Sequence, residues 1–243
     1  MHEHLAITRL FNQLFGGIVA SILHAVGISA DPATAIDNAF VLELLVAGGL
    51  IAFFVVVRLS LSVEKPNAAQ QITEMVHEGI GGLGEQIIGH GYEQFQPFLT
   101  CIFLFVLLNN LIGLIPGVPA PTTSPAVPLG LAIPTFLYYN YQGLRAQGPI
   151  GYLKHFMGPI WWMSWLLFPI EIVSHLARIM SLTIRLYANM YASDLVTLGF
   201  FSLIPIGVPA IFLGLHVFVS VIQAFVFTLL SMIYLSLAVA HEH

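Results

Sequence analysis

The stretch SLTIRLYANMYASDL, residues 181–195, places an arginine, an asparagine and an aspartate inside one of the most apolar regions of the chain. A charge near the middle of a bilayer costs at least about 2.5–3.5 kcal/mol on the insertion scale. A role in stabilising the fold could explain one such residue, but it does not explain a series of them along one helix. Arg185 and its polar neighbours therefore predict a functional site within a membrane.

The composition of the whole chain indicates that lipid is its main solvent. Of 243 residues, 58% are hydrophobic and 8% are charged, and the mean hydropathy is +0.90. A soluble domain has about 25% charged residues. The single cysteine, Cys101, excludes an internal disulfide and any multi-cysteine metal site. We expect the HEH triplets at 2–4 and 241–243 to be solvated termini, so the sequence predicts neither a metal nor a cofactor.

Five segments are predicted to cross the bilayer, since a span needs roughly 20 apolar residues. The third is short and contains Pro134, and the N-terminal LFGGIVASILHAVGI is interpreted as a possible interfacial helix. The predicted spans are 39–57, 98–115, 127–144, 160–196 and 210–240. The expected organisation is an N-terminal tail (1–38), a first membrane helix (39–63), a surface segment (64–97), a membrane helix pair (98–145) and a helical hairpin (156–240).

The segment QQITEMVHEGIGGLGEQII, residues 70–88, predicts an amphipathic helix between the first two spans. Glutamates and glycines occupy much of its polar side. Its apolar stripe comprises Ile72, Met75, Val76, Ile80, Leu83 and Ile87. Two placements remain open for this helix: on the cytoplasmic membrane surface, or packed against the protein.

Lysine and arginine predict the orientation, because cytoplasmic loops carry an excess of them. Arg58 and Lys65 follow the first span, and Arg145 and Lys154 follow the third. The N-terminal tail carries only Arg9. With five spans, the N-terminus is expected outside and the C-terminus in the cytoplasm.

The last two apolar segments are too long for ordinary spans. Residues 160–196 would form a helix of about 55 Å, whereas the hydrocarbon core is about 30 Å thick. To stay within that core, the helix must lie roughly 55–60° from the bilayer normal, far beyond the usual tilt. Residues 210–240 present the same difficulty in milder form. The two segments are predicted to form a long, strongly tilted antiparallel hairpin, unless one of them breaks.

The first long segment carries a polar stripe and a small-residue stripe, with Arg185 on the border between them. Small residues permit the close approach of a neighbouring helix in lipid. The polar stripe comprises Glu171, His175, Arg178, Arg185 and Asn189, and the small-residue stripe comprises Ser174, Ser181, Ala188 and Ala192. Asp194 lies about 180° from Arg185 around the helix and faces elsewhere.

The second long segment carries His216 and Gln223, which are seven residues apart and share one face. In an antiparallel hairpin, Arg185 and Gln223 would lie at one depth, and Asp194 and His216 at another. Both pairs are centred on the loop around Pro205. Two polar pairs with a common centre indicate that the hairpin is functional.

Most of these features have a plainer alternative. A lone intramembrane asparagine or glutamine most often holds helices together. A lone histidine such as His216 is more often a hydrogen-bonded structural residue than a proton carrier. The small-residue stripe could pack inside the same chain. Arg185 is harder to explain in this way, because of the cost of its charge.

The stretches SLTIRLYANMYASDL and GLHVFVSVIQAFVFTLLSMIYLSLA closely resemble the subunit a family of F-type ATP synthases, the stator half of a proton channel. The resemblance covers the chain from about residue 98 to the end. LLNNLIGLIP is similar to the family's second-span motif, and the combination of R-L-x-x-N-M with Q-A-F-x-F is highly specific.

The resemblance implies that Arg185 is the stator arginine and Gln223 its neighbour. It places Asp194 and His216 in the outer half-channel and Glu171 in the inner one. His175 and Asn189 join the expected proton path, and Ser174, Ser181, Ala188 and Ala192 are expected to face the ring. Some bacterial members carry glutamate where Asp194 stands and aspartate where Gly113 stands, which leaves open the groups that complete the outer path.

The expected partners are a ring of c subunits, the peripheral stalk b subunits and membrane lipid, with no nucleic acid. The resemblance implies no covalent chemistry, and it implies the bacterial plasma (inner) membrane as the location. The alternative function is a stand-alone ion channel or secondary transporter. Such proteins show internal repeats and broken helices at a central site, and this sequence shows no repeat.

Overall fold

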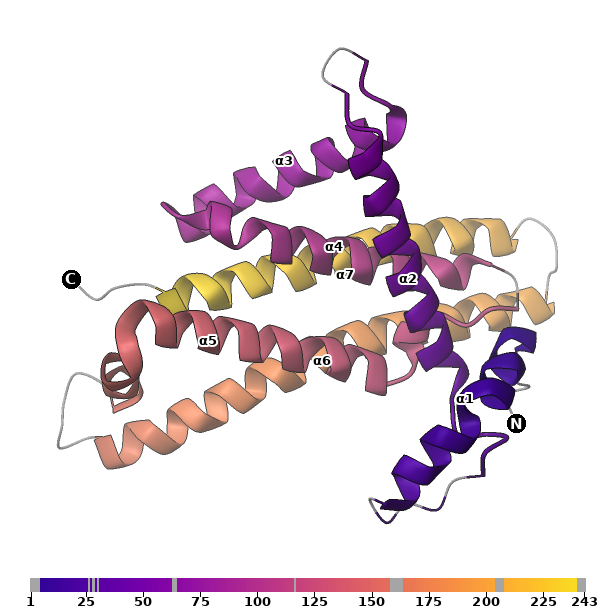
Figure 1. Ribbon diagram of the computed structural model, residues 1–243, viewed down its shortest axis with the longest axis horizontal. Helices are drawn as coiled ribbons and strands as arrows, with labels where there is room; N and C mark the ends of the chain where they lie inside the picture. Colours follow the sequence, from indigo (N-terminus) through magenta and orange to yellow (C-terminus); the bar gives the residue numbers. More distant parts are fainter. Residues whose placement is uncertain are drawn as a thin grey trace.

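The computed structural model describes residues 5–25, 27, 29, 31–62, 65–115, 117–157, 164–203 and 208–239, with no side chains described over 149–164 and 201–209. The HEH triplets and Pro205 lie outside these residues. The described residues form helices and no strand (Figure 1), which confirms the predicted all-α class. The helices are α1 (Ala6–Ala25), α2 (Asn38–Leu59), α3 (Ala68–Ile88), α4 (Gln96–Leu111), α5 (Ala126–Met157), α6 (Ser164–Leu203) and α7 (Val208–Val239), with short 3-10 turns η1 (Tyr92–Gln94), η2 (Ile112–Leu114) and η3 (Pro121–Thr123).

Within the part of the chain that the structure describes, five helices are long and apolar enough to cross a membrane: α1, α2, α4, α6 and α7. Four of them correspond to predicted spans. The remaining predicted span, 127–144, forms the first part of α5, whose apolar surface is interrupted by polar residues such as Asn140 and Arg145. α5 bends at Gly148, where φ is +73°, a conformation that glycine adopts at little cost.

Helices α4, α5, α6 and α7 lie side by side in alternating directions, and α2 crosses them steeply (Figure 1). α4 packs on α7, and α5 packs on both α6 and α7, which also pack on each other. α6 is unbroken over 40 residues despite an internal Pro169, which makes it about 60 Å long. A helix of that length remains within a bilayer only when strongly inclined. The predicted tilted antiparallel hairpin is therefore confirmed as α6 and α7.

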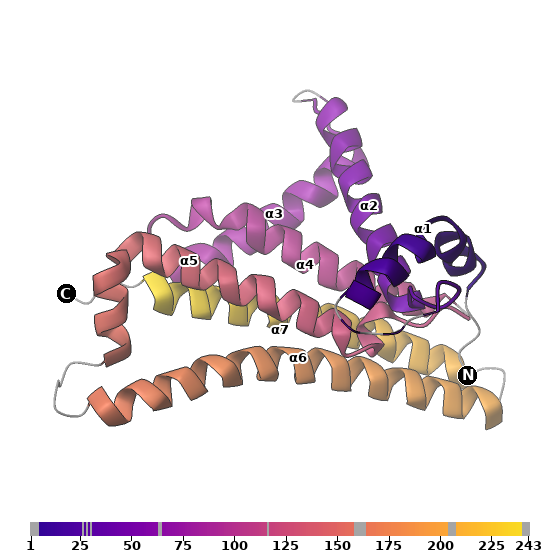
Figure 2. The ribbon, with the colours of Figure 1, turned by 60° about the horizontal axis from the view of Figure 1, so that its bottom comes forward.

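One side of α6 is left uncovered by the rest of the chain. Figure 2 shows α6 along one edge of the molecule, with the other helices on a single side of it. Buried residues make up 11% of its apolar window, against 22–33% for the other four candidate spans. Helix α6, which carries the most intramembrane charges, thus also has the smallest buried share of the five candidate spans.

The two halves of α3 differ in their surroundings: one packs on the protein and the other is exposed. In its second half, Ile80, Leu83 and Ile87 pack into a core cluster shared with α4 and α7. In its first half, Ile72 and Met75 are 59% and 72% exposed. The C-terminal half is therefore packed on the protein, and the exposed half remains available for a membrane surface.

α1 starts beside the start of α2 and runs along the segment that connects them. The backbone N–H of Leu5 donates to Asn38 Oδ1 at 3.1 Å, and the Asn12 side chain makes two 3.0 Å bonds with the backbone of Ile36. If α1 crossed the bilayer, residues 31–37, which are not helical, would have to return through lipid. Lipid does not tolerate exposed irregular backbone. We therefore expect α1 to lie in the interface, as the sequence predicts.

This placement predicts different surroundings for neighbouring side chains of α1. Leu14 is 64% exposed and lies on the apolar side with Leu10 and Ile18, whereas Gln13 lies on a polar flank about 100° away. A fluorophore attached through Leu14→Cys, in a Cys101→Ala chain reconstituted into vesicles, should be quenched by brominated lipid. The matched Gln13→Cys label should be quenched by aqueous iodide instead. Equal quenching of both labels by lipid would indicate a spanning helix.

Candidate functional site

Arg185 is half-buried on α6, and its only described polar contact is a hydrogen bond from Nη2 to Ser181 Oγ at 3.3 Å. No carboxylate in the described part of the chain forms an ion pair with it. A guanidinium left in lipid without a counter-charge is costly. Its counter-charge is therefore expected to come from outside this chain.

Asp194 and His216 meet across the α6–α7 hairpin. Asp194 Oδ1 lies 3.5 Å from His216 Nδ1, and His216 is 2% exposed. Ser193 Oγ lies 3.0 Å from the same ring nitrogen. The predicted pairing of Asp194 with His216 is present in the structure, and these residues with Asn110, Thr122 and Ser220 are called the His216 cluster below.

The other ring nitrogen of His216 has a fixed role. Nε2 lies 3.2 Å from the backbone carbonyl oxygen of Asn110, and a carbonyl oxygen can only accept a hydrogen bond. Nε2 must therefore carry a hydrogen in both the neutral and the protonated ring. Any additional proton is gained or lost at Nδ1, on the side of Asp194 and Ser193.

Buried polar groups from α4, α7 and the loop before α5 hold this arrangement. Thr122 Oγ1 donates to Asn110 Oδ1 at 2.8 Å, and Asn110 Nδ2 donates to the Ser220 carbonyl at 3.5 Å. All three residues are fully buried. The backbone N–H of Ala120 donates to the Asp194 carboxylate. The loop thus contacts the acid directly and supports the histidine through Asn110.

A second set of polar residues, called the His175 cluster, lies toward the start of α6 and comprises Glu171, His175 and Tyr139. His175 Nε2 is 3.4 Å from Glu171 Oε1, and His175 Nδ1 is 3.0 Å from the hydroxyl of Tyr139 on α5. With a neutral ring, the Nε2–H donates to the carboxylate and Nδ1 accepts from the tyrosine. The Arg178 guanidinium lies 5.1 Å from the ring centroid of Tyr234, which is within cation–π range.

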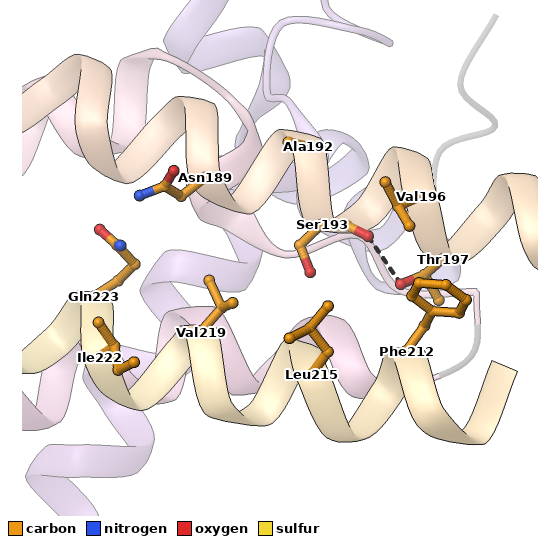
Figure 3. A pocket seen from close by; sticks show the side chains of 10 residues that line it. All are labelled: Asn189, Ala192, Ser193, Val196, Thr197, Phe212, Leu215, Val219, Ile222 and Gln223. Atoms are coloured by element: carbon orange, nitrogen blue, oxygen red, sulfur yellow. Dashed lines mark hydrogen bonds between the residues drawn. The ribbon is translucent and has the colours of Figure 1, made fainter. Parts of the chain in front are cut away.

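A groove of about 330 Å³ runs between α6 and α7, lined by five residues of α6 between Asn189 and Thr197 and five of α7 between Phe212 and Gln223 (Figure 3). Asn189 and Gln223 face each other at one end, and Ser193 points into its middle. No hydrogen bond joins Arg185 to Gln223 within the described part of the chain. Gln223 instead lies opposite Asn189, which follows Arg185 by about one turn of α6.

The small-residue stripe is accessible in this chain. Ala188 and Ala192 are exposed, and Ser174 and Ser181 are half-buried. Ala192 also lines the groove. The alternative in which this stripe packs inside the same chain therefore fails for its two alanines.

The sequence prediction missed Ser193, Asn110, Thr122 and Tyr139. The paired asparagines at 109–110 in an otherwise apolar helix were a usable signal, since intramembrane amides are rarely without a partner. Ser193 and Thr122 carry no such signal, because serine and threonine hydroxyls commonly bond to nearby backbone. Tyr139 carries none either, because its partner His175 lies on another helix.

Comparison with known proteins relates residues 40–236 to the model of the family described as ATP synthase A chain. The chain is 50% identical to "ATP synthase subunit a" of Koribacter versatilis over 244 aligned residues, which covers all of both chains. It is 44% identical to the protein of the same name from Solibacter usitatus, over 96% of this chain and all of the relative.

Close packing at Gly113 predicts that the loop over the His216 cluster is sensitive to one methyl group. A Cβ at Gly113 would lie 2.8 Å from Ala120 Cβ, whereas a Cβ at Gly130 on α5 would meet nothing within 4 Å. Gly113→Ala should lower the free energy of unfolding by about 1–3 kcal/mol through overpacking. Gly130→Ala should raise it by about 0.5–1 kcal/mol, because glycine weakens a helix. Denaturation by SDS would measure both, and equal stability of the two variants would contradict the packing.

Proposed function

The chain belongs to the ATP synthase A chain family, and from this membership we propose that it couples proton flow to the rotation of a ring of c subunits. Membership makes it a multi-pass membrane subunit of the ATP synthase. The proposal adds two offset half-channels with Arg185 between them. The chain then carries out ion translocation and no covalent chemistry.

One observation carries the proposal: two separate polar clusters lie on either side of Arg185, which pairs with no carboxylate among the described residues. Glu171 precedes Arg185 by 14 residues, or about 21 Å along α6. Asp194 follows it by nine residues, or about 14 Å. Each cluster reaches a different end of the inclined hairpin. This separation suits one access path to each side of the membrane.

The His216 cluster is assigned to the outer half-channel. A proton arriving at Asp194 can pass to His216, since Nδ1 faces the acid at 3.5 Å. The proton then reaches the ring at the depth of Gln223 and Asn189. A ring carboxylate neutralised there can rotate through lipid, where an ionised one would be too costly.

The His175 cluster is assigned to the inner half-channel. A ring site returning from lipid releases its proton toward Glu171, through the hydrogen-bonded His175 and Tyr139. The carboxylate left on the ring is then stabilised by Arg185. Arginine suits this role because it stays charged, whereas a lysine can lose its proton.

Arg185 also separates the two half-channels. A fixed positive charge repels a proton that would pass directly from one cluster to the other. Each proton crossing about 100 mV delivers roughly 2.3 kcal/mol, so a leak would dissipate the drive. The open side of α6, with Ser174, Ser181, Ala188 and Ala192, is assigned to contact with the c ring.

The alternative of a stand-alone channel or secondary transporter has less support. Transporters bind their ions where membrane helices are broken, whereas α6 is continuous past Arg185 and α7 is continuous past Gln223. The proposed assembly also includes the b subunits of the peripheral stalk. The proposed location is the bacterial plasma membrane, with the N-terminus outside and the C-terminus in the cytoplasm.

A charge exchange between the two helices tests the function. Arg185→Gln alone should abolish ATP-driven proton pumping, because the ring carboxylate loses its partner. Adding Gln223→Arg should restore part of the pumping, since Gln223 faces Asn189 across the groove, one turn from Arg185 (Figure 3). Pumping would be measured in membrane vesicles and normalised to the assembled complex.

Val219→Arg in the Arg185→Gln chain is the matched control. Val219 lines the same groove but lies one turn from Gln223, or about 6 Å along the axis. The neighbouring Ser220 is not used as the control position, because it is 0% exposed and hydrogen-bonded within the His216 cluster. Equal rescue from Val219 and Gln223 would show that the position of the charge does not matter, against the proposal.

A further inference from the structure

Ser193 lies where the buried His216 cluster meets the groove. Its hydroxyl is 3.0 Å from His216 Nδ1, and Figure 3 shows it pointing into the groove between α6 and α7. Among the described polar residues in contact with His216, Ser193 alone lines the groove. A proton that leaves His216 for the groove meets this hydroxyl first.

The hydrogen bonds of His216 direct its exchangeable proton to this side. Nε2 is held as a donor by the carbonyl of Asn110, so Nδ1 is the nitrogen that gains and loses a proton. Two oxygens lie near Nδ1: Ser193 Oγ at 3.0 Å and Asp194 Oδ1 at 3.5 Å. The carboxyl can supply a proton to Nδ1, and the hydroxyl can carry one away.

The groove beyond Ser193 has room for water but an apolar wall. Its volume of about 330 Å³ exceeds that of several water molecules at about 30 Å³ each. Leu215 and Val219 occupy the wall between Ser193 and the amide pair Asn189 and Gln223 (Figure 3). These apolar side chains cannot accept a proton, and among the described contacts of His216 only Ser193 offers the groove a group that can.

The nearby Thr197 cannot replace Ser193. Its hydroxyl donates to the backbone carbonyl of Ser193 at 2.8 Å, and it lies one turn further from Arg185 along α6. The Ser193 hydroxyl is oriented by a ring nitrogen instead. A hydroxyl both donates and accepts, which is what proton transfer through a fixed point requires.

We propose that Ser193 is a proton relay between His216 and the water of the groove, an inference that rests on the proposed function. Protonated Asp194 gives its proton to Nδ1 and becomes a carboxylate. The resulting imidazolium passes the Nδ1 proton to Ser193 Oγ, while the original hydroxyl proton moves to a water molecule in the groove. His216 returns to its neutral Nε2–H form. One proton enters and one leaves.

The test uses the assembled complex in membrane vesicles, with ATP-driven pumping normalised to the amount of complex. Ser193→Ala should slow pumping at least about tenfold, since a positioned proton-transfer group contributes at least that much. Ser193→Thr retains a hydroxyl and should keep at least about half of the rate. Thr183→Val is the matched control, because it removes an α6 hydroxyl that is bonded to the Ile179 carbonyl and should pump at the wild-type rate.

The solvent isotope effect separates a relay from a merely structural serine. In Ser193→Ala, proton transfer out of His216 becomes rate-limiting, so pumping should slow more in D₂O than it does for the wild type. A structural serine would change assembly and leave the isotope effect unchanged. If Ser193→Ala assembles poorly, the nearly isosteric and weakly hydrogen-bonding Ser193→Cys takes its place under the same criteria.

Asp194→Asn in the same preparation distinguishes a failure of the Ser193 relay from a failure of the outer half-channel assignment. If Asp194→Asn stops pumping and Ser193→Ala pumps at the wild-type rate, the relay is wrong and the outer half-channel stands. If both variants pump normally, the assignment of the outer half-channel is itself wrong. Slow pumping by both, with rescue by Ser193→Thr, supports the relay.

Discussion

A guanidinium in lipid that no described carboxylate of the same chain neutralises is the constraint on which the rest of this structure depends. Two acids lie on the same helix, but each is engaged elsewhere. Glu171 contacts His175, and Asp194 contacts His216 and the backbone of Ala120. Because the two acids of α6 are engaged within the chain, we propose that the counter-charge of Arg185 comes from a partner at the open side of α6.

The length and inclination of the hairpin separate the two polar clusters that lie on either side of Arg185. A helix perpendicular to the bilayer spans the core in about 20 residues, which leaves little length to separate the two half-channels that we propose. The 40 residues of α6 place one cluster about 21 Å before the arginine and the other about 14 Å after it. The core between α4, α5, α6 and α7, with Leu186 and Met190 buried in it, keeps these distances fixed.

Features that depend on one helix or one hairpin could be predicted from the sequence. The lengths of the apolar runs predicted the membrane helices, and apolar periodicity predicted α3. The midpoint argument placed Asp194 and His216 at one depth, where the structure shows them in contact. The carbonyl of Asn110, the hydroxyl of Thr122 and the ring of Tyr139 come from other elements, and periodicity within one segment does not specify such contacts. The same limit applies to α3, where only the packing of α4 and α7 decides which half is covered.

We propose that Arg185 both stabilises the ring carboxylate and blocks direct proton flow between the two half-channels. The most direct measurement is the proton permeability of vesicles that contain the Arg185→Ala complex, together with ATP-driven pumping. We expect pumping to be lost and protons to flow passively through the membrane sector. Arg178→Ala, which removes the arginine over Tyr234, should leave the vesicles tight. Normal ATP-driven pumping by an assembled Arg185→Ala complex would contradict the account.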